Sequence, residues 1–360
     1  MTTLEIILFL NFIIISIFAY VNKYKALDSA VMYFLSILLC SASAFQYLIL
    51  DPNDYNQYKI IFQKYPDGFS SVYMQGHELG FNFLIWLFKL LNFSYESFIF
   101  FIVLVLFYGI MHVLKLFNKD KLFIFLSIIT LVVSFNLTSN LYRQAIAVSI
   151  VLMVLVRNRS FVSQFAIVLI ATMFHISAIT MLPYLFMQKN KSLQVLFIIL
   201  LLSLVLYFAR IDGILLNIIG VFPTYVEFIP YSSLTRVAHN IEGSDKIQYA
   251  YRSYYFLSTI LILFFVFNYK KIANRGFISM QANWRFINFL TYGVFLYGAT
   301  YKIGSMSRLG IYFYILIPII LYICLNSVLN NRDSKIILMC FSYASLLGLF
   351  FVKNLHFNFI

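Results

Sequence analysis

The chain has 360 residues, of which 62% are hydrophobic, 19% aromatic and only 11% charged, and its formal net charge is +13. Soluble globular domains contain about 25% charged and about 45–50% apolar residues. A chain with so few polar residues cannot cover itself with polar surface, so a water-soluble globular fold is excluded. The apolar residues fall into charge-free runs close to the length of a membrane-crossing helix, about 20 residues for a core of about 30 Å.

These runs predict an all-α fold, a polytopic transmembrane helix bundle of about 10–13 membrane segments that includes re-entrant or half-spanning segments. We expect one integral membrane domain over residues 1–360. The run Leu4–Val21 lacks the basic start and the small-residue cleavage site of a signal peptide, so we expect it to be the first span. The other clear runs are Ala30–Leu50, Phe98–Leu114, Leu122–Leu137, Leu141–Val156, Leu193–Ala209, Tyr254–Asn268, Phe286–Ala299, Leu309–Leu325 and Ile336–Val352.

Two further apolar stretches do not have the pattern of simple spans. Leu79–Leu91 is short and carries Lys89, and Phe161–Met187 is interrupted near His175 and at Pro183. If the first stretch is re-entrant and the second is a pair of half-spans that meet near His175, every strongly basic short loop falls on one face. An excess of Lys and Arg marks the cytoplasmic face, so most of the net charge reflects topology and does not indicate a nucleic-acid partner.

The opposite face is nearly neutral and carries two long extracytoplasmic loops, at about 51–78 and 210–253. Arginines at span ends often extend to the lipid head groups. Several arginines around one outer cavity instead suit a pyrophosphate or a carboxylate, because the planar guanidinium donates bidentate hydrogen bonds and stays charged. The arginines that we expect to bind pyrophosphate are Arg143, Arg236, Arg252 and Arg308.

His175 lies where Phe161–Met187 must turn back, next to the outer face. A histidine on an apolar face is more often a core residue than a catalyst, but an imidazole with an ordinary pKa of about 6.5 can accept a hydroxyl proton at neutral pH. Glu78 opens the Leu79–Leu91 stretch, where an acid is also a favourable helix cap. We predict that His175 is the catalytic base and that Glu78 is a reserve base.

The outer loop at about 51–78 combines aspartates with tyrosines. Carbohydrate sites use carboxylates to bind hydroxyls and aromatic rings to cover apolar sugar faces. The alternative is a solvated loop that keeps the outer face near neutral. The residues that we expect to contact sugars are Asp54, Tyr58, Tyr142, Gln144 and Tyr312. No cluster has the spacing of metal ligands, so no metal site is predicted.

Several short motifs, each weak alone, are informative in their order and spacing. They are Asp54-x-x-x-Tyr58, Glu78-Leu79-Gly80-Phe81, Arg143-Gln144, Phe174-His175-Ile176-Ser177-Ala178 and Arg308-x-x-x-Tyr312-Phe313. From Asp51 to about Leu325 this series resembles the EpsG-like branch of the Wzy-type polysaccharide polymerases. The resemblance covers most of the chain, and no motif of the C-terminal region is matched.

The resemblance implies a glycosyltransferase of the bacterial inner membrane that builds O-antigen, capsule or exopolysaccharide. Such enzymes transfer a growing glycan from undecaprenyl pyrophosphate to a new lipid-linked repeat unit at the extracytoplasmic face, without a nucleotide sugar, a cofactor or an obligatory metal. The implied partners are the undecaprenyl-pyrophosphate-linked oligosaccharide, membrane lipid, a flippase and a chain-length regulator. Nucleic acid is not among them.

In the expected mechanism, the arginines hold the donor pyrophosphate and stabilise its charge as it leaves. His175 accepts the proton of the acceptor hydroxyl, which attacks the anomeric carbon with inversion, while Glu78 and Asp54 orient the sugars. A ligase that moves finished polymer to another acceptor is an alternative with nearly the same site. A flippase or transporter fits less well, because it would show internal repeats and ionisable residues at mid-membrane.

Overall fold

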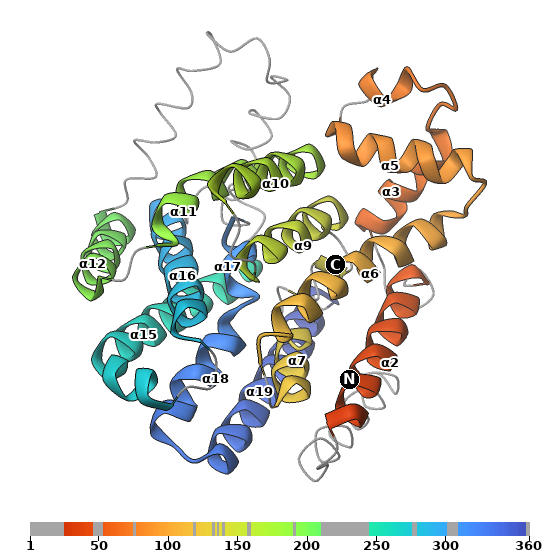
Figure 1. Ribbon diagram of the computed structural model, residues 1–360. Coiled ribbons are helices and arrows are strands. Elements are labelled where there is room, and N and C mark those ends of the chain that lie inside the picture. Colours follow the sequence, from red (N-terminus) through yellow and green to blue (C-terminus); the bar gives the residue numbers. More distant parts are fainter. Residues whose placement is uncertain are drawn as a thin grey trace. The chain divides into compact units, whose positions relative to one another are not determined.

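A computed structural model gives the structure of the protein, and within its described ranges the secondary structure is helical, with no strand (Figure 1). This confirms the all-α prediction. The described residues are 25–45, 53–74, 77–117, 120–131, 134, 137–138, 141–156, 160–189, 192–209, 245–275, 279–300 and 309–357. The predicted first span, Leu4–Val21, and the outer-loop residues 210–244 lie outside these ranges.

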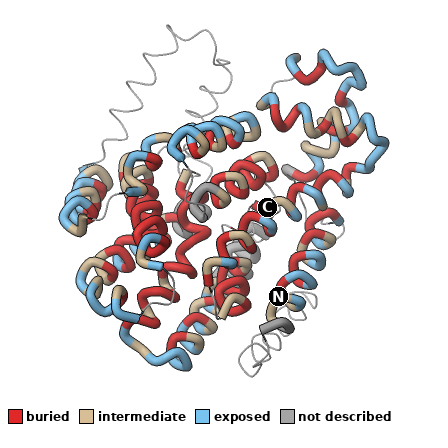
Figure 2. Tube along the Cα trace, in the orientation of Figure 1, coloured by how far each residue is buried: buried red, intermediate tan, exposed pale blue. Residues whose placement is uncertain are grey.

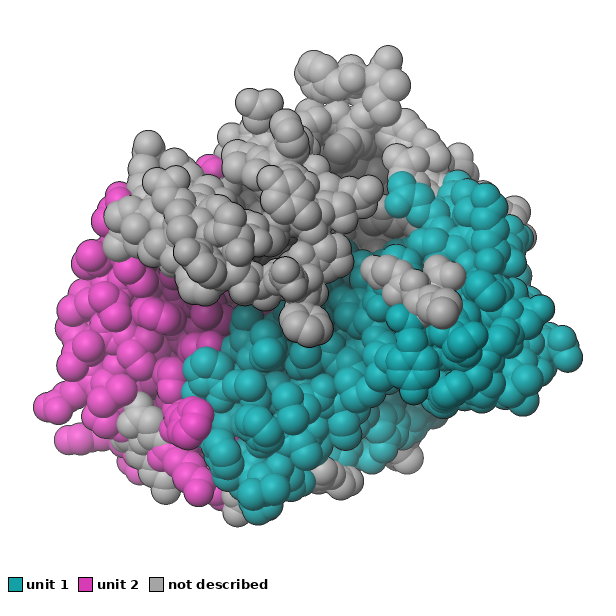
Figure 3. Space-filling view, turned by 90° about the horizontal axis from the view of Figure 1, so that it is seen from above, with its two compact units in different colours: residues 1–185, 335–360 teal, residues 186–334 magenta. Residues whose placement is uncertain are grey.

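The chain forms two compact units, shown in different colours in Figure 3. Unit 1 comprises Met1–Leu185 together with Lys335–Ile360, and unit 2 comprises Phe186–Ser334. The prediction of one integral membrane domain is not tested by this division and stays a prediction.

Unit 1 is built around α6, which packs against α2, α3, α7 and α9, while α10 packs against α5 and α9. Its described helices are α2 (Lys25–Ala44), α3 (Asn53–Lys64), α4 (Ser71–Met74), α5 (Leu79–Leu90), α6 (Tyr95–Leu114), α7 (Lys121–Ile129), α9 (Tyr142–Val156), α10 (Phe161–Phe174), the 3-10 helix η2 (Ile176–Met181) and most of α19 (Asn331–Phe357). Helix α11 (Leu182–Met187) ends the segment that continues into unit 2.

The long apolar stretch Phe161–Met187 is broken, as the sequence predicts. Helix α10 ends at Phe174, because the next residue, His175, has an extended backbone (φ −154°, ψ 119°) that cannot continue an α-helix. A 3-10 helix follows at once and leads into the short helix α11. The break therefore separates two short apolar helices that meet near His175.

Close packing of α6 on α9 depends on small side chains. Ser149 of α9 is fully buried and donates a hydrogen bond of 2.6 Å to the carbonyl oxygen of Val105 in α6. One turn further along α6, Gly109 lies so close that a Cβ atom there would be 2.5 Å from Ser149 Oγ and 2.9 Å from Ser149 Cα. Ala145 and Ala147 of α9 are also fully buried. The small residues of α9 are therefore packing residues.

In unit 2, α16 packs against α12 and α15, and α15 packs against α18. The predicted run Leu309–Leu325 is not one helix, because α17 ends at Tyr314 and a new helix begins at Ile317 with Pro318 in its first turn, where a missing N–H costs little. The described helices are α12 (Leu193–Ala209), α15 (Asp245–Arg275), α16 (Met280–Thr300), α17 (Ile311–Tyr314) and α18 (Ile317–Val328).

Two described helices, Tyr95–Leu114 and Tyr251–Arg275, are long and apolar enough to cross a membrane. Others are apolar but shorter, among them α9, α10 and α12. Large apolar side chains are exposed on α2, α10 and α12, including Phe34 at 64% and Phe208 at 70%. Figure 2 colours the chain by how far each residue is buried. The number of membrane segments predicted from the sequence stays a prediction.

We expect Gly109→Ala to destabilise unit 1, because the added methyl group would overlap Ser149 and overpacking of this kind costs about 1–3 kcal/mol. The measurement is the melting temperature of the detergent-solubilised protein. Gly68→Ala is the control, since a Cβ atom there would lie at an ordinary 3.5 Å from Ser70 Oγ. Equal melting temperatures for Gly109→Ala and the wild type would contradict the account of this interface.

Candidate active site

The carboxylate of Glu78 joins segments that are far apart in the sequence. It lies directly before α5 and accepts a hydrogen bond of 2.5 Å from Nη1 of Arg143, which is in the first turn of α9. Its other oxygen accepts a bond of 3.3 Å from the backbone N–H of Ile176, at the break that follows α10. One acidic side chain thus holds the starts of α5 and α9 at the end of α10.

Tyr58 of α3 completes the surroundings of Arg143. Nε of the guanidinium donates a hydrogen bond of 3.0 Å to the Tyr58 hydroxyl. The Tyr58 ring packs edge to face against Tyr142 and Phe81, with centroid distances of 5.5 Å and 5.8 Å. The guanidinium therefore has a fixed orientation, set by a carboxylate on one nitrogen and a phenol on another.

Both members of the ion pair remain partly accessible, with 27% of the Arg143 side chain and 16% of the Glu78 side chain exposed. Burial raises the pKa of the Glu78 carboxyl, but the Arg143 charge, the neighbouring His175 and hydrogen bonds lower it by more, so the net pKa lies below its ordinary value. Glu78 is consequently ionised at neutral pH. A carboxylate that has a lowered pKa and already accepts two hydrogen bonds is a weak proton acceptor.

The imidazole of His175 caps the 3-10 helix that follows it. Nδ1 accepts a hydrogen bond of 3.2 Å from the backbone N–H of Ser177 and lies 2.7 Å from Ser177 Oγ. A backbone N–H can only donate, so Nδ1 must carry a lone pair, and the neutral ring then bears its hydrogen on Nε2. In this arrangement Nε2 of His175 is a hydrogen-bond donor.

Residues that the sequence analysis did not select hold the start of α5. A Cβ atom on Gly80 would lie 2.9 Å from the backbone oxygen of Met173, so the close approach of α5 to α10 requires glycine. The buried amide of Asn82 donates bonds of 3.1 Å to the carbonyl oxygens of Val72 and His77. The contact with Met173 explains why a glycine stands two residues after Glu78.

The opposite end of α5 is also held, which explains the charge inside its apolar sequence. Lys89 forms an ion pair of 3.2 Å with Asp67 and donates a hydrogen bond to the carbonyl oxygen of Tyr65. The indole of Trp86 donates a bond of 3.2 Å to the Asp67 carbonyl oxygen. Helix α5 is therefore tied at both ends to the polar segments around it.

The structure brings together five of the residues selected from the sequence, namely Tyr58, Glu78, Tyr142, Arg143 and His175.

The other selected residues are not shown to join this cluster. Asp54 lies in the first turn of α3, and Gln144, like Tyr142, is buried. Arg252 of α15 and the fully buried Tyr312 of α17 belong to unit 2. Arg236 and Arg308 lie outside the described residues. The roles assigned to all of these residues stay predictions.

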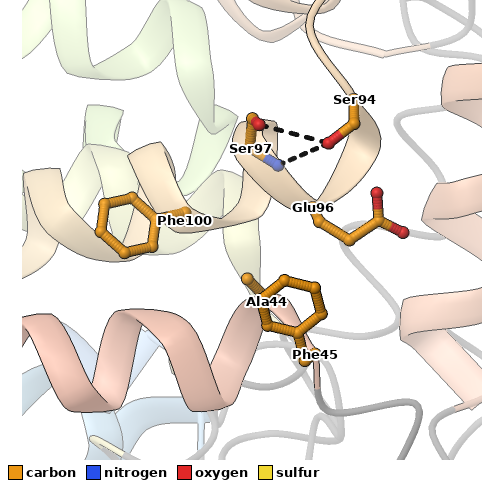
Figure 4. A pocket seen from close by; sticks show the side chains of 6 residues that line it. All are labelled: Ala44, Phe45, Ser94, Glu96, Ser97 and Phe100. Atoms are coloured by element: carbon orange, nitrogen blue, oxygen red, sulfur yellow. Dashed lines mark hydrogen bonds between the residues drawn. The ribbon is translucent and has the colours of Figure 1, made fainter.

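A pocket of about 550 Å³ lies elsewhere in unit 1, between the end of α2 and the start of α6 (Figure 4). It shares no residue with the Arg143 cluster and contains no cation, although the nearby Lys59 pairs with Glu96 at 3.1 Å. Because a site for the predicted pyrophosphate requires positive charge, the Arg143 cluster is the better candidate site. The pocket is lined by Ala44, Phe45, Ser94, Glu96, Ser97 and Phe100.

Within the described ranges, no three His, Cys, Asp or Glu side chains gather as metal ligands would. The sequence-based prediction of metal independence stays a prediction.

A family model described as the EpsG family matches residues 29–359, nearly the whole chain. The chain belongs to the EpsG family. This confirms the resemblance of the motifs, and membership of the EpsG family indicates a polymerase of polysaccharide biosynthesis with glycosyltransferase-like activity. No curated protein and no solved structure matches this EpsG-family chain.

We expect Glu78→Gln to lower the melting temperature at pH 7, because Arg143 would lose its counter-charge. The pKa of Glu78 is lowered in the folded protein, so the ion pair stabilises the fold above the ordinary carboxyl pKa of 4.5 and this contribution is lost as the pH falls through the lowered pKa. Melting temperatures of the wild type and Glu78→Gln, measured in detergent over a pH series, should therefore converge at acid pH.

Asp67→Asn is the control for this experiment, since the Asp67 side chain is 91% exposed and surface ion pairs contribute only about 0–1 kcal/mol. A melting-temperature difference between Glu78→Gln and the wild type that stays constant down to about pH 2, well below the ordinary carboxyl pKa, would contradict the lowered pKa of Glu78.

Proposed function

We propose that this protein polymerises lipid-linked glycan repeat units, with Arg143 as the residue that binds the donor pyrophosphate. The observation that carries the proposal is the fixed, partly exposed guanidinium of Arg143, held by Glu78 and Tyr58. It lies in the first turn of α9, where the helix dipole adds positive potential. A guanidinium held in this way is prepared for bidentate bonds to phosphate oxygens.

The proposed location is the bacterial inner membrane, with several spans and the site at the extracytoplasmic face. The apolar composition, the apolar helices and the exposed apolar side chains of α2, α10 and α12 support membrane insertion. The excess of basic residues in the loops that do not carry the site supports its extracytoplasmic orientation. A hydrophobic body of this kind also suits an undecaprenyl chain.

In the proposed reaction, the acceptor is the terminal sugar of a new undecaprenyl-pyrophosphate-linked oligosaccharide. Its hydroxyl gives up a proton to a histidine of the site, and its oxygen attacks the anomeric carbon of the donor glycan. The bond from that carbon to the pyrophosphate oxygen breaks, and undecaprenyl pyrophosphate leaves with the electron pair. Arg143 stabilises the charge on the leaving group.

The remaining residues of the cluster support these steps. Glu78 neutralises and orients Arg143 between substrates, and Tyr58 contributes a hydroxyl and an aromatic face for a sugar. Arg308, Arg236 and Arg252 are proposed as additional pyrophosphate ligands. Inversion at the anomeric carbon follows from a single direct displacement. The flippase that delivers repeat units and a chain-length regulator are the proposed protein partners.

We expect Arg143→Ala to abolish polymer formation in cells at normal protein level, because the leaving pyrophosphate loses its main cation. The measurement is the length distribution of the polysaccharide on a gel, together with the amount of single lipid-linked units, which should accumulate. Arg332→Ala is the control, since Arg332 is exposed at the start of α19, on the predicted cytoplasmic face, and should leave chain length unchanged.

Full-length polymer in the Arg143→Ala strain would refute the assignment of Arg143. Long polymer that is made but remains unattached would indicate a ligase in place of a polymerase.

A further inference from the structure

The proposed reaction requires a group that accepts the proton of the acceptor hydroxyl, and the groups expected to do so from the sequence are already engaged. Glu78 is held as a carboxylate by Arg143 and by the Ile176 N–H. Nδ1 of His175 accepts the backbone N–H of Ser177, which leaves the hydrogen on Nε2. Neither side chain presents a lone pair of suitable basicity to a substrate hydroxyl.

His77, which the sequence analysis did not select, directly precedes Glu78 and lies beside the same cluster. Its ring packs edge to face against Phe81 with a centroid distance of 6.2 Å. The Phe81 ring also contacts Tyr58, whose hydroxyl binds Arg143. One aromatic side chain therefore links the imidazole of His77 to the tyrosine that orients the guanidinium.

A hydrogen bond holds the backbone at His77 in place. The backbone carbonyl of His77 accepts the buried amide of Asn82 at 3.1 Å, which fixes the chain at this point. Neither ring nitrogen forms a hydrogen bond with another described residue, and the side chain is half-buried. An imidazole with a lone pair that no described residue occupies can serve as a general base.

The electrostatic environment of His77 keeps the ring neutral. Burial lowers the pKa of His77 below its ordinary value, and the positive charge of Arg143 on α9 lowers it further, while the negative charge of Glu78 partly offsets both. These are the charged groups that act on the ring from the described elements around it. At neutral pH the imidazole is thus unprotonated and able to accept a proton.

We propose that His77 is the general base of the polymerisation. The proton of the acceptor hydroxyl passes to a ring nitrogen of His77 as the oxygen bonds to the anomeric carbon. The bond to the pyrophosphate breaks at the same time, and the imidazolium later releases its proton to water. This assignment rests on the proposed function.

The test measures initial polymerisation rates of purified protein with lipid-linked repeat units over a pH series. The wild-type rate should fall as the pH drops through the pKa of His77, with its midpoint below 6.5. His77→Gln, which keeps polarity but cannot accept a proton, should lose about 10²–10⁴-fold in rate and lose this acid limb. His175→Gln, which keeps an N–H donor, should retain the acid limb.

Added imidazole provides a second measurement that a purely structural role would not change. In His77→Ala the free imidazole should restore part of the rate, because it fills the space of the missing base. His112→Ala, in which the change lies within α6 away from the cluster, should keep both the wild-type rate and the acid limb. Melting temperatures of all variants separate loss of chemistry from loss of fold.

Either of two results would overturn the assignment of His77 while leaving the proposed function intact: a wild-type rate and acid limb in His77→Gln, or loss of the acid limb in His175→Gln alone. Absence of polymerisation by the wild-type protein would overturn the proposed function and this assignment together.

Discussion

The ion pair between Glu78 and Arg143 is the interaction on which the arrangement of the site depends. Charges that are mostly withdrawn from water must be paired, and removal of one partner from such a pair is strongly destabilising. Since Glu78 also accepts the Ile176 N–H, the pair fixes α5, α9 and the end of α10 at a single point. The glycine at position 80 and the break at His175 are what allow these backbones to meet there.

The same constraint divides the chemical roles among neighbouring residues. A cation that must be neutralised by Glu78 is already oriented for an anionic group, so the proposed binding of pyrophosphate would require little rearrangement. The carboxylate that performs this task has a lowered pKa and is unsuited to accept a proton, and His175 uses its Nδ1 to cap the helix that follows. In the proposed mechanism, proton transfer therefore falls to a group outside the charged contact, and we assign it to the adjacent His77.

The sequence predicted the apolar helices and the break near His175 because both follow from local composition, but it did not predict α3 and α4 within the outer loop at about 51–78. It predicted five members of the cluster because polar side chains beside apolar runs often line a site. It did not predict which side chains touch, since Arg143 meets partners 65 and 85 positions away. His77 and Asn82 were not among the site residues predicted from the sequence, although a histidine next to Glu78 was a visible signal. Pro318 was also a signal that Leu309–Leu325 is divided, but the run was predicted from its apolar composition alone.

The most direct test of the account is the affinity of the purified protein for a polyprenyl pyrophosphate, compared between the wild type and Arg143→Gln. Charge-assisted hydrogen bonds contribute about 1.5–3 kcal/mol, so the account predicts about a tenfold to hundredfold weaker binding by Arg143→Gln, with a smaller salt dependence. Arg332→Gln should bind as the wild type does. Equal affinities for the wild type and a folded Arg143→Gln variant would contradict the central claim that Arg143 holds the pyrophosphate.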